Sequence, residues 1–418
     1  MIILLLLIII LLNSTYSSIQ PKEEEITIVF FYYVEQYHCL PAYLEYTLRQ
    51  AIISNSDSNI VLLSNINDCK DANDKSYWLW KNISDHIKII NTDTIISNKT
   101  KHYIKRTSDV SSSMFRKNDN DKNNPLWASA SFRFFFIYDF MKKYNYTNAI
   151  HCESDTLLYS NMNSIRKQLL SISTLAATPL SWKSSTNLFT TASLFVINDM
   201  GSLDNLLNFF ITLADYHHLV DYNRNLHFIN NHTESPWFDY LKWLRRVSCC
   251  VKSRYLTDDR GLGIKPYSIN EMSILTYFGI RNRLDLHYLP ILPNSKGPIP
   301  RKSSYRYELR NYGDFNGFKG VFDPGTFGQM IAGSPHKKKG FVDTSHIASD
   351  ILLRGTCRAT FQCIKADESL LKLWNSSVFV FVPMLMCTGD DFQKTTLLHT
   401  MHIHSKNTEN FISKECNI

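Results

Sequence analysis

The sequence predicts an α/β fold in which a mixed, mainly parallel sheet is flanked by helices. Short apolar runs alternate with helical patterns over the first 200 residues. Such alternation is typical of parallel strands joined by right-handed helical crossovers. The apolar runs are rich in β-branched and aromatic residues, which indicates buried strands. We expect one domain over residues 26–418, made of a sheet-bearing half to residue 200 and an elaborated second half from residue 201.

The first strand and the first helix have the clearest patterns. Residues 26–34 (ITIVFFYYV) form an apolar, aromatic run that predicts a buried strand. Pro41 then begins a helical pattern, PAYLEYTLRQAII, in which Leu44, Leu48 and Ile52 lie on one face. Proline suits the first turn of a helix because the N–H that it lacks would have no helical partner there.

The later elements are read from the same patterns. Buried strands are expected at residues 60–63, 87–90, 175–177, 192–197 and 378–381, and helices at residues 203–214, 237–247 and 270–278. A helix at residues 131–144, which carries Arg133, precedes an apolar strand that starts at residue 149. Three polar or glycine-rich segments are expected to be irregular: 107–124, 215–233 and 313–340.

Residues 2–12 form an unbroken apolar run that is followed by small and polar residues. A helix of this length spans about 16 Å, too short for a hydrocarbon core of roughly 30 Å. We interpret residues 1–17 as a signal peptide and expect no transmembrane anchor in the mature chain. The protein is then expected in the lumen of the endoplasmic reticulum or Golgi, or secreted. Five N-x-S/T sequons are candidate glycosylation sites: Asn82, Asn98, Asn145, Asn231 and Asn375.

Charge and cysteine content narrow the class of partner and the compartment. The formal net charge is +7, but the basic residues are scattered, which argues against nucleic acid as a partner. Nine cysteines in an oxidising compartment are expected to be partly paired. Cys357 and Cys363 are the expected local pair, and Cys152 is expected to be a buried free thiol. The oligomeric state stays open.

The strand from residue 149 ends on Glu153-Ser154-Asp155. Two carboxylates at positions i and i+2 point to the same side of a strand. They form a hard-oxygen site that suits Mn²⁺ or Mg²⁺, with a phosphate as a further ligand. This layout suggests an enzyme that handles a metal-bound nucleoside diphosphate. The alternative is a turn with two solvated carboxylates that cap the strand.

The arginine-bearing helix SFRFFFIYDFMKKY and the strand AIHCESDTLLY together resemble the glycosyltransferase A fold and its D-x-D motif. The resemblance covers residues 26–197, with HIHSK near the C terminus as a separate match. It implies a Rossmann-like half that binds a nucleotide-sugar donor and a second half that binds a glycan, glycoprotein or lipid acceptor. Glu153 replaces the first aspartate of the motif. This longer side chain leaves open that Asp155 is the only direct ligand, with Glu153 bound through water or ribose.

The segment His402-Ile403-His404-Ser405-Lys406 is the second candidate site segment. The resemblance implies that a C-terminal histidine reaches the metal and a nearby lysine reaches the diphosphate. We assign these roles to His404, which is closer in sequence to Lys406, and to Lys406 itself. Imidazole beside carboxylates favours Mn²⁺ over Mg²⁺. The alternative is a pair of surface histidines near a mobile C terminus.

Two residues are candidates for contacts with the donor nucleotide. Arg133 is placed to reach the phosphates or the ribose, and Tyr32 lies at the end of the first strand, where a base can stack. The alternatives are an ion pair of Arg133 with Asp139 or a strand end, and core packing of Tyr32.

An inverting transfer needs a base to deprotonate the acceptor hydroxyl. Glu271 is the first candidate and Asp323 of FDPGTFGQ is the second. Stabilisation by the helix dipole explains Glu271 equally well. Formation of a turn by Asp-Pro-Gly explains Asp323 equally well. The stereochemistry stays open, since a metal-binding histidine favours retention.

Two other functions stay open. One is a secreted glycan-binding protein that keeps the fold without turnover, for which the departure of Glu153 from the motif leaves room. The other is a secreted zinc hydrolase that uses the His-rich segment, although this segment matches no helix-borne zinc pair. The ligands in that case would be drawn from Asp215, His217, His218, Asp221, His227 and His232.

Overall fold

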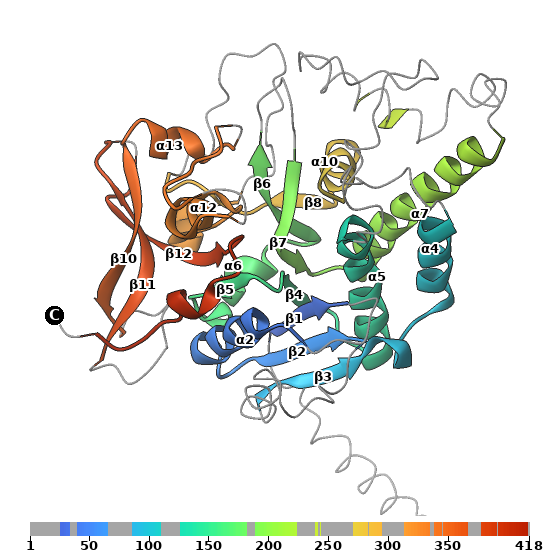
Figure 1. The fold of residues 1–418 in the computed structure, drawn as a ribbon, viewed down its shortest axis with the longest axis horizontal. Helices are drawn as coiled ribbons and strands as arrows, with labels where there is room; N and C mark the ends of the chain where they lie inside the picture. The colour runs from blue at the N-terminus through green and yellow to red at the C-terminus, as the bar shows by residue number, and fades with distance from the viewer. Residues whose placement is uncertain are drawn as a thin grey trace, which may run out of the picture.

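The computed structural model describes residues 26–33, 40–65, 86–109, 126–181, 189–223, 239–240, 243, 271–282, 284–294, 313–334, 338–344, 346–366, 378–390 and 392–416. Its larger sheet has seven strands in the order β3-β2-β1-β4-β7-β6-β8 (Figure 1). In that order they are β3 (Lys88–Asn91), β2 (Asn59–Ser64), β1 (Thr27–Tyr32), β4 (Ala149–Cys152), β7 (Phe189–Ile197), β6 (Leu175–Ser181) and β8 (Leu286–Tyr288).

The pairing of these strands is mixed and mainly parallel. β1 runs parallel to β2 and β4, β2 to β3, and β6 to β8. β7 runs antiparallel to both of its neighbours, β4 and β6. The predicted α/β class and mixed sheet are therefore confirmed, as are the strands expected over the first 200 residues.

The first strand is buried on both faces, as its apolar composition predicts. Ile28 and Phe30 belong to one core, and Val29 and Phe31 belong to the core on the opposite face. Successive side chains of a strand point to opposite faces, so an unbroken apolar run can serve two cores.

Helices flank the larger sheet (Figure 1). α2 (Ala42–Ser54) follows Pro41 and buries Leu44 and Leu48 in the core that contains Ile28. α5 (Leu126–Tyr144), α7 (Met200–Asn223) and α10 (Glu271–Arg281) contribute to the other core. The helices predicted at residues 41–53, 131–144, 203–214 and 270–278 are thus confirmed.

Two predictions for this part of the chain were wrong or incomplete. α7 continues to Asn223, so residues 215–223 are helical rather than irregular. α4 (Asn98–Asp109) has no counterpart among the predicted helices. Its sequence is mostly polar, and its two apolar residues, Tyr103 and Ile104, pack on the core. The ring of Tyr103 stacks on Phe135 with centroids 4.1 Å apart.

A second sheet has the order β10-β11-β12-β5, and β9 pairs in parallel with β12. Its strands are β5 (Thr156–Leu158), β9 (Gly320–Phe322), β10 (Cys357–Lys365), β11 (Phe379–Cys387) and β12 (Thr395–His402). The turn Glu153-Ser154-Asp155 connects β4 of the larger sheet to β5 of the smaller one. The acid pair therefore lies where the two sheets meet.

Short elements fill the remaining connections. They are η2 (Thr92–Thr94), η3 (Met162–Ile165), α6 (Arg166–Leu170), α11 (Phe315–Phe318), α12 (Thr326–Ala332), α13 (Ser349–Leu353) and η5 (Thr408–Phe411). Because α11, β9 and α12 all fall within residues 313–340, the prediction of a long loop there was wrong. Glycine and proline in this segment mark turns between short elements.

The disulfides correct the predicted local pairing. Cys357 bonds to Cys387, and Cys363 bonds to Cys416, so Cys357 and Cys363 are not partners. Both cysteines lie on the nine-residue strand β10, where the extended geometry holds Cys357 and Cys363 too far apart to bond. Cys152 is a buried free thiol, as predicted. The other four cysteines lie outside the described residues.

Several further predictions also lie outside the described residues. They are the signal peptide, the sequons at Asn82, Asn231 and Asn375, and most of residues 107–124 and 237–247. Asn98 and Asn145 are exposed, and Asn145 lies in the turn between α5 and β4 with φ 58°. Among the described residues, no helix is long and apolar enough to cross a membrane.

Candidate metal and donor site

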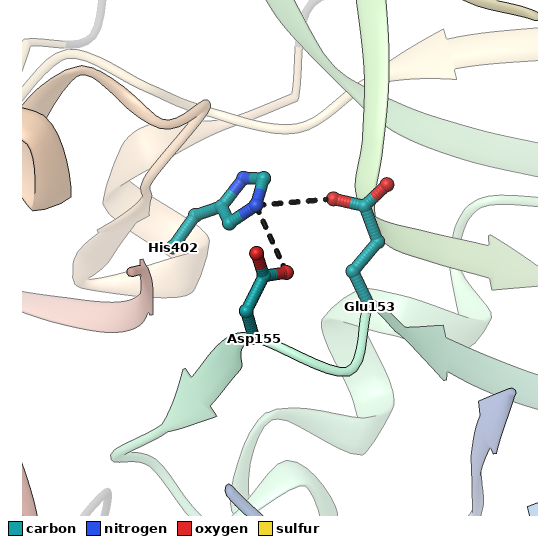
Figure 2. A group of neighbouring side chains, drawn as sticks. All are labelled: Glu153, Asp155 and His402. Carbon is teal, nitrogen blue, oxygen red and sulfur yellow. Dashed lines mark ion pairs between the residues drawn. The ribbon is translucent and has the colours of Figure 1, made fainter. Parts of the chain in front are cut away.

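The C-terminal strand brings its histidine to the acid turn. β12 pairs antiparallel with β5, and His402 is in register with Thr156. The backbone N–H of Ile403 also donates to the carbonyl of Asp155 at 2.8 Å. These contacts fix the end of β12 against the start of β5, so the side chains of His402, Asp155 and Glu153 converge (Figure 2).

The three side chains have the spacing of ligands around one ion. His402 Nε2 lies 3.0 Å from an oxygen of Asp155 and 3.4 Å from an oxygen of Glu153. One ligand atom from each residue lies within 4.8 Å of the others. Adjacent ligands about 2.1 Å from an octahedral ion are about 3.0 Å apart. Two carboxylates and one imidazole therefore fit Mn²⁺ in number, chemistry and spacing.

The carboxylates and the imidazole of this group shift one another's pKa values. Burial would raise the pKa of Asp155, but the positive charges of His402 and Lys406 hold that pKa well below its usual range. Burial opposes ionisation of Glu153 as well, but Arg133 and His402 lower its pKa. Burial would lower the pKa of His402, yet the two carboxylates raise it to about 9. The protein thus holds two carboxylates ionised behind a compensating positive charge.

Lys406 lies at the exposed side of the group. Its backbone N–H donates to the carbonyl of Ile403 at 3.0 Å, which closes a tight turn after β12. The ammonium group forms an ion pair with Asp155 and lies 4.9 Å from the ring centroid of Tyr43. The pKa of Lys406 is raised because Asp155 outweighs the effect of burial. The turn therefore places the protonated ammonium group of Lys406 beside the acid pair.

Arg133 contacts two carboxylates, those of Glu153 and Glu271. Arg133 forms an ion pair with Glu153, and its second terminal nitrogen lies 3.6 Å from Glu271. The side chains of Arg133 and Glu271 are 6% and 5% exposed. Burial raises the pKa of Glu271 to about 7, although Arg133 opposes the rise. The alternative partner considered for Arg133, Asp139, instead accepts hydrogen bonds from Ser97 and Thr100.

His404 stacks on His402 rather than joining the group of three. The ring centroids are 4.1 Å apart, with an angle of 27° between the planes. Burial and the charge of His402 lower the pKa of His404 to about 3, so its ring is neutral. The structure therefore brings His402 into the candidate ligand set and places His404 beside it.

Asp323 is buried at the end of β9. One carboxylate oxygen accepts from the N–H groups of Gly325 and Phe327, at 2.8 and 3.0 Å. The other accepts from Gly328 and His402, at 2.8 and 3.1 Å. Its oxygens are therefore directed to backbone donors, and the side chain is fully buried.

The aromatic residues flank the site on the side of β1 and α2. Tyr32 is partly buried at the end of β1, and burial together with Tyr43 raises its pKa to about 12. Sequence reasoning missed Tyr43, whose hydroxyl lies 3.5 Å from that of Ser154. A tyrosine in the first turn of the helix after β1 was the available signal.

Of the candidate zinc ligands in the His-rich segment, only the side chain of Asp215 is described. Asp215 forms ion pairs with His102 and Arg106 on α4, at 3.1 and 2.9 Å. These side chains are partly exposed, as expected for a solvated surface pair. The histidine side chains of this segment lie outside the described residues.

No protein-family model matches the chain, and no curated protein matches it in sequence. The solved structures to which the chain is similar include the bifunctional glycosyltransferase WbbM, at 13% identity and TM-score 0.28, over 47% of this chain and 35% of that one. Mouse xyloside xylosyltransferase 1 is similar at 8% identity and TM-score 0.34, over 64% of this chain and 85% of that one. The UDP-bound glycosyltransferase domain of the YGT toxin is similar at 8% identity and TM-score 0.32, over 63% of this chain and 79% of that one. At these values the likeness assigns no activity to the chain.

Proposed function

We propose that the protein is a metal-dependent glycosyltransferase that transfers a sugar from a nucleotide-diphosphate sugar to a glycan, protein or lipid acceptor in the secretory pathway. The observation that carries this proposal is the convergence of Glu153, Asp155 and His402, with Lys406 beside Asp155. Such a site combines ligands for a divalent ion with a cation for a phosphate. Ligands of open α/β sheets commonly bind at the carboxyl ends of the strands, where β4 ends.

In this proposal Glu153, Asp155 and His402 hold Mn²⁺ or Mg²⁺. When bound, the ion acts as a Lewis acid that neutralises charge on the diphosphate. Lys406 stabilises the negative charge that develops on the leaving diphosphate, which a preorganised ammonium can do without reorganisation of solvent. The ion pair with Arg133 keeps Glu153 ionised and oriented. His404 remains a candidate ligand only if its ring moves from its stack on His402.

Tyr32 and Tyr43 are the candidate aromatic contacts for the nucleoside. Glu271 is the candidate base for an inverting transfer, because a carboxyl with a pKa of about 7 can accept a proton near neutral pH. Arg133 separates Glu271 from Glu153, so Glu271 also serves as the second carboxylate that orients Arg133. The anomeric configuration of the product, determined by NMR, decides between inversion and retention.

Donor consumption tests the proposal. Nucleotide release from UDP-, GDP- and CMP-sugars is measured with and without Mn²⁺, for the secreted protein and for Asp155→Asn. We expect release from one donor class that needs the metal and falls at least 100-fold in Asp155→Asn. The matched control is Asp204→Asn, which removes a carboxylate of a partly exposed pair with Lys99 and leaves release unchanged.

The alternative functions predict different results. A glycan-binding protein binds sugars but releases no nucleotide from any donor. A zinc hydrolase retains zinc through purification and is indifferent to Asp155→Asn. Either pattern would contradict the proposed transfer reaction.

A further inference from the structure

Asp323 is the only carboxylate among the described site residues that faces backbone donors alone. Its two oxygens accept hydrogen bonds from four backbone N–H groups. A carboxylate satisfied in this way is a structural anchor, since charge-assisted bonds to backbone N–H groups are strong. The positions of these four donors show which part of the molecule Asp323 anchors.

The two oxygens connect two segments that are far apart in sequence. The first oxygen binds Gly325 and Phe327 and so shapes the turn that leads into α12. The second oxygen binds Gly328 on that helix and the N–H of His402 on β12. The backbone N–H of Asp323 in turn donates to the hydroxyl of Thr400 at 3.0 Å. The main chain of His402 is therefore tied directly to the Asp323 carboxylate.

The glycines of the same turn fit closely against the two histidines. A Cβ at Gly328 would collide with the carbonyl oxygen of His402, and a Cβ at Gly325 would lie 2.7 Å from His404 Nε2. Gly325 also has φ 99°, a conformation that favours glycine. The turn is thus shaped to receive the end of β12, with hydrogen bonds on one side and steric contact on the other.

We propose that Asp323 is a positioning residue that holds His402 at the metal site by anchoring its backbone to the turn at residues 323–328. The inference rests on the proposed metal site. It assigns to Asp323 an indirect role in place of proton transfer. Groups that orient a metal ligand typically change metal affinity about 10–100-fold when they are removed.

Direct metal binding tests this role without reference to activity. Mn²⁺ affinity is measured by electron paramagnetic resonance of the free ion, at a temperature well below the melting temperature of every variant. Asp323→Asn leaves one acceptor oxygen for two pairs of N–H donors, so either the turn or His402 loses its anchor. We expect Mn²⁺ to bind at least tenfold more weakly to this variant.

A matched control separates positioning from general destabilisation. Gly320→Ala places a Cβ against the ring of His399 on the same pair of strands, but away from His402. We expect this variant to lose thermal stability while its Mn²⁺ affinity stays within twofold of the parent protein. If Asp323→Asn does not fold, Gly328→Ala displaces His402 from the same turn and is expected to weaken Mn²⁺ binding.

The outcomes also separate this inference from the proposed function. Tight Mn²⁺ binding by the parent protein and by Asp323→Asn would overturn the positioning role and leave the metal site intact. Equal losses of affinity in Asp323→Asn and Gly320→Ala would overturn it as well, because the effect would then be general. Absence of Mn²⁺ binding by the parent protein would overturn the metal site itself, and the positioning role with it.

Discussion

His402 and Asp155 lie side by side because β12 pairs with β5, and the imidazole Nε2 is 3.0 Å from a carboxylate oxygen of Asp155. The two residues are far apart in sequence: Asp155 directly precedes β5, and His402 is the last residue of β12. Glu153 approaches the same imidazole from the end of the larger sheet, at 3.4 Å. The geometry of the candidate site thus depends on how the two sheets pack against each other.

The first prediction concerns pH and His402. Its folded-state pKa is raised from 6.5 to about 9 by the two carboxylates. A raised pKa means that the protonated ring stabilises the fold fully below pH 6.5, and that this contribution is lost as the pH rises through about 9. Without metal, we expect His402→Gln to melt several degrees below the parent protein at pH 6, with the difference shrinking towards pH 9.

Thermal melts in a chelating buffer measure this difference across the pH range. Asp204→Asn serves as the control, since its partly exposed ion pair with Lys99 does not involve His402. A difference between His402→Gln and the parent protein that stays constant from pH 6 to pH 9 would contradict the assigned charge state.

The second prediction concerns Arg133, the buried cation that pairs with Glu153. Arg133→Gln leaves Glu153 and Glu271 buried without their shared arginine, and breaking a buried ion pair costs roughly 3–5 kcal/mol of unfolding free energy. Burial already raises the pKa of Glu271 to about 7. Adding Glu271→Gln to this variant removes a buried carboxyl that must otherwise bind a proton or stay charged without a partner, so we expect part of the loss to be recovered. Urea unfolding of the single and double variants measures both effects.

An exposed ion pair provides the comparison for this cycle. Arg281 and Asp239 lie 3.0 Å apart, and their side chains are 45% and 42% exposed. Arg281→Gln is expected to change the free energy of unfolding by less than about 1 kcal/mol. Equal losses in Arg133→Gln and Arg281→Gln would show that Arg133 is not a buried counter-ion.

The third prediction concerns packing beneath the site. His399 is fully buried, and its ring accepts from Ser160 through Nδ1 and donates to the carbonyl of Phe318 through Nε2, at 2.6 and 3.1 Å. A Cβ at Gly320 would collide with this ring. We expect Gly320→Ala to cost roughly 1–3 kcal/mol of unfolding free energy, as overpacked core substitutions do.

A double-mutant cycle identifies the cause of this loss. If the collision with His399 is responsible, Gly320→Ala should cost much less in a His399→Ala background, since the small side chain leaves room. The same cost in both backgrounds would place the strain elsewhere on β9.

Local patterns in the sequence predicted most of the larger sheet. Its strands are short apolar runs, and α2 follows a proline with apolar residues on one face, so neighbouring residues carried the information. The helix α4 was missed because Tyr103 and Ile104 are the only apolar residues in its sequence. Its stability comes from packing on α5 and α7, which no local pattern reveals.

The sequence named several of the side chains that the structure brings together, and their roles stay predictions. Arg133 contacts Glu153 and Glu271, and Lys406 contacts Asp155. The acid pair could be located because a strand end is visible in the local sequence. The choice between His402 and His404 depends on where β12 ends, and that is set by its pairing with β5. The disulfides likewise depend on the pairing of β10 with β11 and on the return of the C-terminal segment, and both are long-range features.

The most direct test of the central claim is the melting temperature of the protein with UDP, GDP, CMP and their sugars, with and without Mn²⁺. A ligand at about 100 times its dissociation constant adds roughly 2.7 kcal/mol of stability, a shift of a few degrees for a chain of this size. We predict a shift for one nucleotide class that requires Mn²⁺, disappears in Asp155→Asn and persists in Asp204→Asn. No shift with any nucleotide, or a shift that is unaffected by Asp155→Asn, would contradict donor binding at this site.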